Sequence, residues 1–514
     1  MRDAGGHRGR GLTRSIDWSL VICWLLLILI GWANIYAPVH SSEPASIFDF
    51  TSRSGKQFVW MVTALGIAVT ILFIIPPRTY EGLSLLIYLG VIALLVAVIF
   101  LGIEVKGSRS WFAFGPVRFQ PAEISKIATS LMLATVMSQL GYKIGRFKDF
   151  IVTALIILLP MMIIVLQSET GSALVYVGFI FMLYREGLSG WLIFMVGMAI
   201  LLFILTLTSS PYVAILVLMG VASLCIFLYS GRFKWWLFIC IPLIVLFSFM
   251  PMLLEYISEA VIGAETIASV NESIAAAVET GETVEVPFLM KIKPIYILLG
   301  FSILSLPFLA FQAFRERNTF VHLAIISFLA GIMLVFSADF LFNDVLQDHQ
   351  RKRIEVLLGM KEDPSGVGYN VNQSMIAIGS GGLFGKGYLN GTQTTYGFVP
   401  EQSTDFIFCT IGEEWGFVGT SFIILLYVFL IWRIIADAER SREAFTRIYG
   451  YCTACCIFMH LFINIGMTIG LMPVIGIPLP FFSYGGSSFL AFSLLFFVAL
   501  RLDEANRELS SFSV

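Results

Sequence analysis

The chain has 514 residues, of which 58% are hydrophobic and 13% are charged, and its formal net charge is −2. Soluble domains contain about 45–50% apolar and about 25% charged residues, so this composition indicates a membrane protein. The net charge says nothing useful about partners, but the lack of a basic stripe with interleaved aromatic residues gives no sign of a nucleic-acid partner.

The apolar residues form segments of roughly 20, long enough for an α-helix to cross about 30 Å of hydrocarbon. Helices satisfy their own backbone hydrogen bonds in lipid, whereas a transmembrane barrel would show alternating apolar and polar residues, which these segments lack. The pattern predicts an all-α, polytopic transmembrane helix bundle with about fourteen spans. The predicted spans are 18–36, 57–75, 83–103, 123–140, 151–167, 172–185, 188–208, 212–230, 235–252, 293–312, 319–340, 405–432, 446–470 and 483–500.

Basic residues divide the connecting segments into two groups. With the N-terminal tail in the cytoplasm, every loop on that side carries at least one Lys or Arg, as the positive-inside rule requires. We therefore predict that both termini are cytoplasmic and that the polar loops 104–122, 253–292 and 341–404 lie outside. The basic residues on the cytoplasmic side are Arg2, Arg8, Arg10, Arg14, Arg78, Lys143, Arg146, Lys148, Arg185, Arg232, Lys234, Arg315, Arg317, Arg433, Arg440, Arg442, Arg447, Arg501 and Arg507.

The first of these outer loops leads into the fourth span through "RFQPAEISK". This motif places Arg118, Glu123 and Lys126 at the mouth of a helix, and Pro121 suits its first turn. Charged residues at this depth usually face a bundle interior or a cavity. The motif is consistent either with side chains that snorkel and anchor the helix or with a polar groove for an anionic lipid headgroup.

The longest outer loop, residues 341–404, holds two unusual motifs. "QDHQRKR" (347–353) is a basic cluster that either is solvated or meets an anion. "IGSGGLFGKG" resembles a phosphate-binding loop, but Ser380 takes the place of the first glycine and Gly387 follows Lys386, so it is not a Walker A motif. Its backbone amides and Lys386 could meet a pyrophosphate, or its glycines could simply bend a structural loop.

The motif "FVPEQSTDFIFCTIGEEWGFVG" places Asp405 where a long apolar run begins. Ser403 or Thr404 could cap the helix there, with the acid favoured by the helix dipole. A carboxylate partly shielded from water beside a polar surface could instead serve as a general base. Glu413 and Glu414 lie about 12–13 Å deeper, too far to share a proton transfer with Asp405. They could pair with buried basic groups or backbone, or they could form a polar path.

Five ordered motifs together resemble the SEDS family (shape, elongation, division and sporulation). Within the family, "IAIGSGGLFGKGYLNGTQ" is more similar to the RodA-like branch than to the FtsW-like branch. The likeness covers the N-terminal third and the chain after residue 345 or so. The motifs are "IPPRTYEG", "GSRSWFAFGPVRFQPAEISKIA", "DPSGVGYNVNQSMIAIGSGGLFGKG", "GTQTTYGFVPEQSTDFIFCTIGEEWGFVG" and "IGLMPVIGIPLPFFSYGGSS".

The resemblance implies a peptidoglycan glycosyltransferase of the bacterial cytoplasmic (inner) membrane. Such an enzyme would polymerise lipid II during cell-wall elongation at the periplasmic face and release undecaprenyl pyrophosphate. The family's essential acid falls on Asp405, the expected catalytic residue. The positions expected to bind substrate are Trp111, Arg118, Glu123, Lys126, Gln373, Ser374, Lys386 and Thr404.

The implied partners are lipid II, a class B penicillin-binding protein and other elongation-complex membrane proteins. No dedicated metal-ligand cluster and no certain cofactor are expected, although a divalent cation such as Mg²⁺ could bridge the pyrophosphate.

The chain departs from the family pattern in two places. "QSETG" stands where the family commonly has "QPDLG", so Glu169 keeps the acid but Ser168 replaces the proline, which leaves the local turn uncertain. In addition, five spans lie between residues 188 and 340 where the family's ten-helix core has one. We assign 319–340 to the core, with 188–208 as the alternative, so that about four helices are extra. The predicted divisions are the core helices 1–187, the inserted helices with a Glu-rich external loop 188–318, the core helix 319–340, the large periplasmic loop 341–404 and the C-terminal core helices 405–514.

Two other functions remain open from the sequence. A lipid II flippase would suit the intramembrane residues Glu413, Glu414 and Lys126, although no internal repeat typical of transporters is found. A non-catalytic membrane scaffold for a class B penicillin-binding protein is the other alternative.

Overall fold

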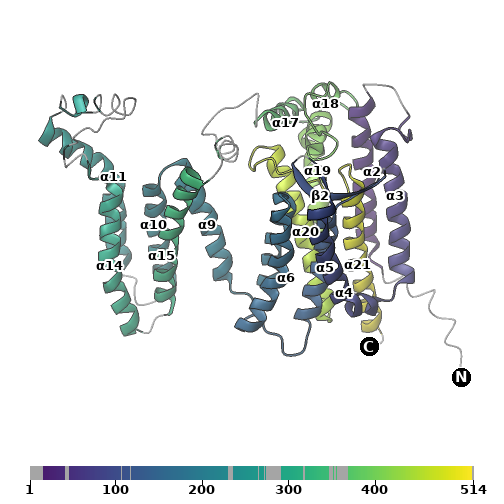
Figure 1. Cartoon of the computed structure of the whole chain (residues 1–514), viewed down its shortest axis with the longest axis horizontal. Helices are drawn as coiled ribbons and strands as arrows, with labels where there is room; N and C mark the ends of the chain where they lie inside the picture. The colour runs from purple at the N-terminus through teal and green to yellow at the C-terminus, as the bar shows by residue number, and fades with distance from the viewer. Residues whose placement is uncertain are drawn as a thin grey trace. The chain divides into compact units, whose positions relative to one another are not determined.

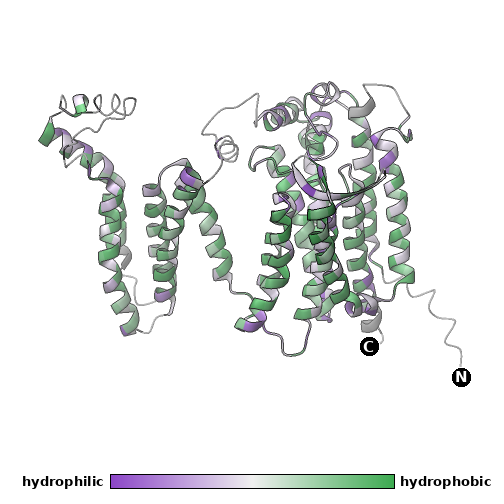
Figure 2. Ribbon diagram, viewed as in Figure 1, coloured by the Kyte–Doolittle hydropathy of each residue, from purple (hydrophilic) through white to green (hydrophobic). Residues whose placement is uncertain are grey.

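A computed structural model describes most of the chain as a helical membrane protein (Figure 1). The described residues are 16–40, 46–105, 107–115, 117–229, 236–263, 266–270, 273, 287, 291–316, 319–345, 351, 355 and 368–511. Within them, twelve helices are long and apolar enough to cross a membrane, and Figure 2 shows that most of the helical ribbon is coloured as hydrophobic. This confirms the predicted all-α, polytopic fold. The N-terminal tail, much of the Glu-rich loop and most of the basic cluster 347–353 lie outside the described residues.

Two of the predicted spans fall on shorter helices. The fourth span corresponds to α5 (Pro121–Met137), and the sixth corresponds to the apolar segment Thr170–Arg185. This segment is divided into α7 (Thr170–Val175), the 3-10 turn η2 (Tyr176–Gly178) and α8 (Phe179–Arg185).

The chain divides into two compact units, Met1–Gly190 with Glu362–Val514, and Trp191–Lys361. The first, here called the core unit, contains α5, α7, η2, α8 and the sheet described below. Its other helices are α2 (Trp18–His40), α3 (Arg53–Val69) with its π-helical continuation η1 (Thr70–Ile74), α4 (Pro77–Leu101), α6 (Phe147–Leu166), α17 (Tyr369–Ser380), α18 (Thr392–Thr395), α19 (Ile407–Arg440), α20 (Ala444–Thr468) and α21 (Gly486–Ser511).

The second unit, here called the middle unit, is a bundle in which α10 contacts α11, α14 and α15. Residues 319–340, assigned to the family core from the sequence, form α15 in this unit. The helix α11 also continues past the predicted end of its span at residue 252. The helices of the middle unit are α9 (Gly190–Thr208), α10 (Pro211–Tyr229), α11 (Trp236–Ile262), α14 (Pro294–Glu316) and α15 (Thr319–Phe340), followed by the π-helical turn η3 (Leu341–Val345).

In the core unit, α5 and α20 are the interior helices. Helix α20 packs against α5, α19 and α21, and 83% of its most apolar stretch is buried within the protein. Because other helices rather than lipid surround them, α5 and α20 can carry polar side chains at membrane depth.

A small sheet between α4 and α5 was not foreseen from the sequence. Strands β1 (Ile103–Val105), β2 (Ser108–Phe114) and β3 (Val117–Phe119) form an antiparallel meander in the order β1-β2-β3. It lies in the polar loop predicted to be external, where Trp111 pairs with Ile103 and Arg118 pairs with Ala113.

Helix α19 is broken at Gly416, whose φ of 64° and ψ of −160° are not helical. The glycine-rich loop 381–387 supplies the hydrogen bonds that the break removes. The N–H groups of Phe417 and Val418 donate to the carbonyls of residues 382 and 383 over 2.9 and 3.1 Å. The N–H groups of Lys386 and Gly387 donate to the carbonyls of residues 413 and 414, both over 3.0 Å. Unsatisfied backbone groups are costly in hydrocarbon, so this exchange makes the break possible.

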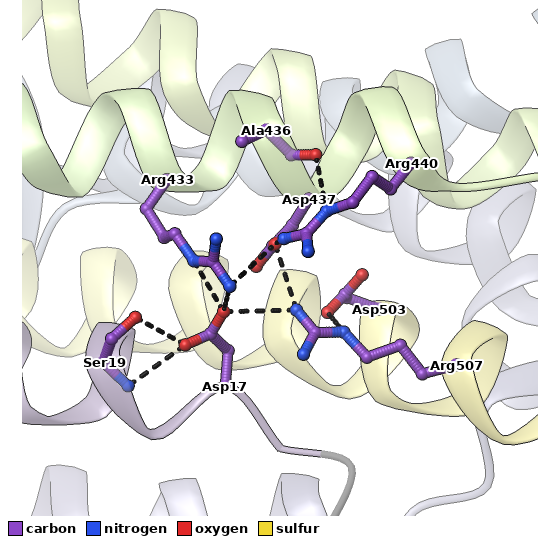
Figure 3. Close-up of polar contacts among 8 residues, drawn as sticks. All are labelled: Asp17, Ser19, Arg433, Ala436, Asp437, Arg440, Asp503 and Arg507. Carbon is purple, nitrogen blue, oxygen red and sulfur yellow. Dashed lines mark hydrogen bonds and ion pairs between the residues drawn. The ribbon is translucent and has the colours of Figure 1, made fainter.

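A cluster of charged side chains around the buried carboxylates of Asp17 and Asp437 joins three helix ends, at the end of the core unit away from the glycine-rich loop (Figure 3). Asp17, which precedes α2, accepts hydrogen bonds from Arg433 of α19 over 2.7 Å and from Arg507 of α21 over 3.2 Å. Burial alone would raise the pKa of Asp17, but hydrogen bonds from Ser19, Arg433 and Arg507 hold it below its ordinary value. The start of α2 and the end of α21 therefore lie at the same end of this unit.

Replacing Gly381 with alanine tests the contact between the glycine-rich loop and α19. A Cβ at this position would lie 1.9 Å from the backbone oxygen of Gly412, whereas Gly379 on α17 faces open space. We expect Gly381→Ala to lower the free energy of unfolding by about 1–3 kcal/mol, as overpacking does. The matched variant Gly379→Ala should be neutral or stabilising by about 0.5–1 kcal/mol. Unfolding of the two purified variants in detergent measures the difference, and equal stabilities would contradict the contact.

Candidate active site

Asp405 lies in the turn that precedes α19 and is half-buried. The helix begins at Ile407 with Phe406 as its N-cap residue, and no side chain caps it. The alternative in which Ser403 or Thr404 caps α19 was therefore wrong. The hydroxyl of Thr404 instead donates to the carbonyl and the carboxylate of Glu401 over 3.2 and 3.1 Å.

Three successive carbonyls, those of residues 403–405, are held by groups from α20 and the segment that follows it. The N–H of Tyr484 donates to the first over 2.9 Å, the hydroxyl of Ser483 donates to the second over 2.6 Å, and the side-chain amide of Asn464 donates to the third over 2.8 Å. The backbone that carries Asp405 is thus fixed by neighbours that are 59 to 81 residues away in the sequence.

The side chain of Asp405 faces Gly476 in the irregular segment 470–485 between α20 and α21. Gly476 has a φ of 76°, and a Cβ there would lie 3.4 Å from Oδ2 of Asp405. A side chain at residue 476 would be strained by this backbone conformation, and its Cβ would lie in van der Waals contact with the carboxylate. Gly476 therefore bounds one side of the Asp405 carboxylate.

The starts of four helices meet around this turn. The side chain of Arg53, the first residue of α3, donates to the hydroxyl of Ser403. The N–H of Gly485 before α21 contacts Gln57 over 3.5 Å, and the N–H of Gln120 before α5 donates to Ser487 over 3.1 Å. With α19, these helices direct the positive ends of their dipoles toward one region, which favours a bound anion.

Arg53 was missed by the sequence analysis. The signal was available, because Arg53 and Lys56 precede the second span on the predicted outer side, where the positive-inside rule disfavours basic residues.

Glu123 and Lys126 lie inside the bundle. Their exposed fractions are 3% and 2%, and Lys126 Nζ lies 2.9 Å from Glu123 Oε2. The same nitrogen lies 2.8 Å from Nε2 of His460 on α20 and 5.0 Å from the ring centre of Phe492. The interpretation of these side chains as snorkelling anchors was wrong, because both charges are buried and paired.

The sheet that carries the predicted residues Trp111 and Arg118 is held by Glu169. Its carboxylate accepts hydrogen bonds from Ser110 of β2 and, over 2.6 Å, from the side-chain amide of Gln120. The turn left uncertain by the missing proline is formed by Ser168 with a φ of 60°. Arg118 of β3 is exposed and Trp111 of β2 is half-buried.

Lys386 belongs to a second paired charge. Its Nζ lies 2.7 Å from Oε1 of Glu413, whose side chain is fully buried. The backbone N–H groups of residues 392–394 also donate to Glu413 over 2.8 to 2.9 Å. Glu413 thus pairs with a basic group and with backbone, one of the alternatives left open by the sequence. The amides of Lys386 and Gly387 already donate to α19, so the glycine-rich loop serves as a structural loop and does not offer them to a phosphate.

The remaining predicted residues lie on α17. The hydroxyl of Ser374 is buried and donates to the carbonyl of Thr468 over 2.9 Å, which joins α17 to the end of α20. Gln373 is half-buried beside it.

Comparisons with known proteins give consistent matches. The model for cell cycle proteins of the FtsW/RodA/SpoVE family matches residues 17–215 and 294–508 and leaves 216–293 outside the match. The chain is similar to the peptidoglycan glycosyltransferase RodA of Treponema pallidum (strain Nichols), with 30% identity over 485 residues that cover 94% of this chain and 95% of that protein. It is also similar to the peptidoglycan glycosyltransferase MrdB of Escherichia coli (strain K12), with 27% identity over 488 residues that cover 95% and 94% of the two chains.

A search of solved structures finds a similar fold in work described as "Structural coordination of polymerization and crosslinking by a peptidoglycan synthase complex". The match has a TM-score of 0.55 and 20% identity, and it covers 96% of this chain and 98% of the other.

The buried ion pair between Glu123 and Lys126 can be tested by measuring the free energy of unfolding of variants. Lys126→Met leaves the carboxylate of Glu123 buried without its cation, and breaking a buried pair in this way costs about 3–5 kcal/mol. We expect the double variant Glu123→Leu with Lys126→Met to recover most of this loss, because apolar side chains then replace both charges. Unfolding of the single and double variants in detergent measures both effects. A Lys126→Met variant as stable as the unmodified protein would contradict the pairing.

Proposed function

This chain belongs to the FtsW/RodA/SpoVE family of cell cycle proteins, and on that premise we propose that it is a peptidoglycan glycosyltransferase that polymerises lipid II. The observation that carries the proposal is the environment of Asp405. A half-buried carboxylate lies on a firmly held turn, at the meeting point of four helix starts and beside an arginine. The helix starts and the arginine would favour the anionic head of a substrate whose lipid tail stays in the membrane.

In the proposed reaction, Asp405 takes the proton from a sugar hydroxyl of the acceptor. The hydroxyl oxygen forms a bond to the anomeric carbon of the donor, and the bond from that carbon to the phosphate oxygen breaks. Undecaprenyl pyrophosphate leaves with the bonding electrons, and the anomeric configuration inverts. Because both substrates keep their tails in lipid, the reaction has to take place at the membrane surface.

The negative charge that develops on the leaving pyrophosphate needs cationic or dipolar partners. Arg53, beside Ser403, and the exposed Arg118 are the best candidates among the described residues. Lys126 and Lys386, which the sequence also suggested for this role, are engaged by Glu123 and Glu413. The described residues gather no group of three or more His, Cys, Asp or Glu side chains that could hold a metal ion.

We propose that the protein lies in the bacterial cytoplasmic membrane with the Asp405 end of the core unit outside. The distribution of basic residues supports this orientation. A class B penicillin-binding protein is the proposed partner, since the similar solved fold comes from work on a complex that coordinates polymerisation with crosslinking.

The flippase alternative loses much of its support. It relied on Glu413, Glu414 and Lys126 as a polar path through the bundle, but two of these three are fixed in ion pairs. No observation on the described residues favours the scaffold alternative.

Polymerisation of labelled lipid II by the purified protein, with and without the penicillin-binding partner, tests the proposal. We expect glycan polymer from the unmodified protein and a loss of at least about 100-fold in Asp405→Asn, as removal of a general base predicts. Asp49→Asn, at a partly exposed acid before α3, is the matched control and should leave the rate unchanged, because the asparagine oxygen can still accept the hydrogen bond from the N–H of Thr51.

Other results would overturn the proposal. Undiminished polymer from Asp405→Asn would remove Asp405 from the chemistry. Partner binding without polymer in either protein would favour the scaffold, and lipid II translocation without polymer would favour the flippase.

A further inference from the structure

Helix α20 presents two buried polar side chains to the segment that faces Asp405. His460 and Asn464 are 1% and 0% exposed, and residues four apart lie on the same face of a helix. Nδ2 of Asn464 donates to the carbonyl of Ile477 over 2.7 Å, and Nδ1 of His460 lies 3.1 Å from the carbonyl of Pro478. The two side chains thus hold consecutive carbonyls of one irregular segment.

Asn464 also joins this segment to the turn that carries Asp405. Its Nδ2 also donates to the carbonyl of Asp405 over 2.8 Å, so one amide group binds both sides. The two neighbours are carbonyl oxygens, which can only accept, and this fixes the orientation of the amide. A side chain without two N–H groups cannot make both contacts.

The buried ion pair of α5 determines what His460 can do. The ammonium group of Lys126 can only donate, so Nε2 of His460 must accept, and the ring hydrogen lies on Nδ1. Nδ1–H then donates to the carbonyl of Pro478. Glu123 and Lys126 in this way act on the segment through His460.

The held segment is the one that bounds the carboxylate of Asp405. Gly476 immediately precedes the two clamped residues, and a Cβ there would lie 3.4 Å from Oδ2 of Asp405. A shift of residues 476–478 would change the space beside Oδ2, whereas a shift of Asp405 would move the base itself. Asn464 limits both movements at once.

We propose that Asn464 and His460 are positioning residues that clamp residues 476–478 against Asp405 and so aim its carboxylate at the acceptor hydroxyl. This inference rests on the proposed glycosyltransferase function. Neither residue touches the reacting atoms. Both act through the placement of the base, so they should affect turnover more than substrate binding.

The first test is the kinetics of Asn464→Leu, which keeps the approximate volume and removes both N–H groups. We expect kcat for lipid II polymerisation to fall on the order of tenfold to a hundredfold, the penalty of a small misplacement of a catalytic group, with KM nearly unchanged. Thr453→Val is the matched control, because it removes a buried hydrogen bond within α20 that does not reach the segment. Its kcat should not change.

The second test uses His460. Glutamine can accept from Lys126 with its oxygen and donate to Pro478 with its nitrogen, whereas leucine can do neither. We therefore expect His460→Leu to lose kcat and His460→Gln to retain most of it. The comparison of His460→Leu with His460→Gln tests the positioning role even if Asn464→Leu does not fold.

The third test combines Asn464→Leu with Asp405→Asn. A positioning residue has nothing left to position once the base is gone, so the double variant should be no slower than Asp405→Asn alone. Full kcat in both leucine variants would overturn the inference, as would a loss in Asn464→Leu that multiplies undiminished on the Asp405→Asn background. If the unmodified protein makes no polymer, the proposed function has failed. If it makes polymer and only the Asn464 and His460 results disagree, the function stands and the clamp fails.

Discussion

Hydrogen bonds from Asn464, Ser483 and Tyr484 to three successive carbonyls before α19 are the constraint on which the candidate site depends. In a membrane protein, irregular backbone is tolerated only where protein groups or water satisfy it. Asp405 lies in irregular backbone of this kind, and the segment that faces its side chain is irregular as well. The chain meets this requirement by pairing two irregular segments, the turn at 401–406 and the segment 470–485, with each other and with α20.

The need to satisfy irregular backbone also explains the glycine-rich loop 381–387. The loop forms backbone hydrogen bonds with α19 on both sides of the break at Gly416, so that neither segment leaves these N–H and carbonyl groups unsatisfied in the membrane.

Buried charges are likewise paired. Glu123 pairs with Lys126 and Glu413 pairs with Lys386, since an uncompensated buried charge would cost several kcal/mol. Intramembrane charges that suggested function from the sequence are thus largely engaged in holding the fold, and Glu123 and Lys126 connect to the site through His460.

The sequence predicts those features that depend on local pattern. Runs of apolar residues locate most of the spans, because burial in hydrocarbon depends on composition over about 20 residues. The ordered motifs single out Asp405. The sequence does not reveal the strands β1, β2 and β3, since short polar strands give weak signals, nor the break at Gly416, since a glycine in an apolar run does not show its φ. Contacts between distant residues, such as Lys126 with His460, are likewise invisible without the folded chain. The division of residues 188–340 into inserted and core helices stays a prediction.

The central claim is that the carboxylate of Asp405 takes the proton in the polymerisation step. The pH dependence of the single-turnover rate, measured for the unmodified protein and for Asp405→Asn in parallel, tests it most directly. The account predicts that the rate of the unmodified protein falls as the pH is lowered, because protonation removes the base, and that the residual rate of Asp405→Asn lacks this acidic limb. An acidic limb that persists unchanged in Asp405→Asn would assign the proton transfer to another group and contradict the account.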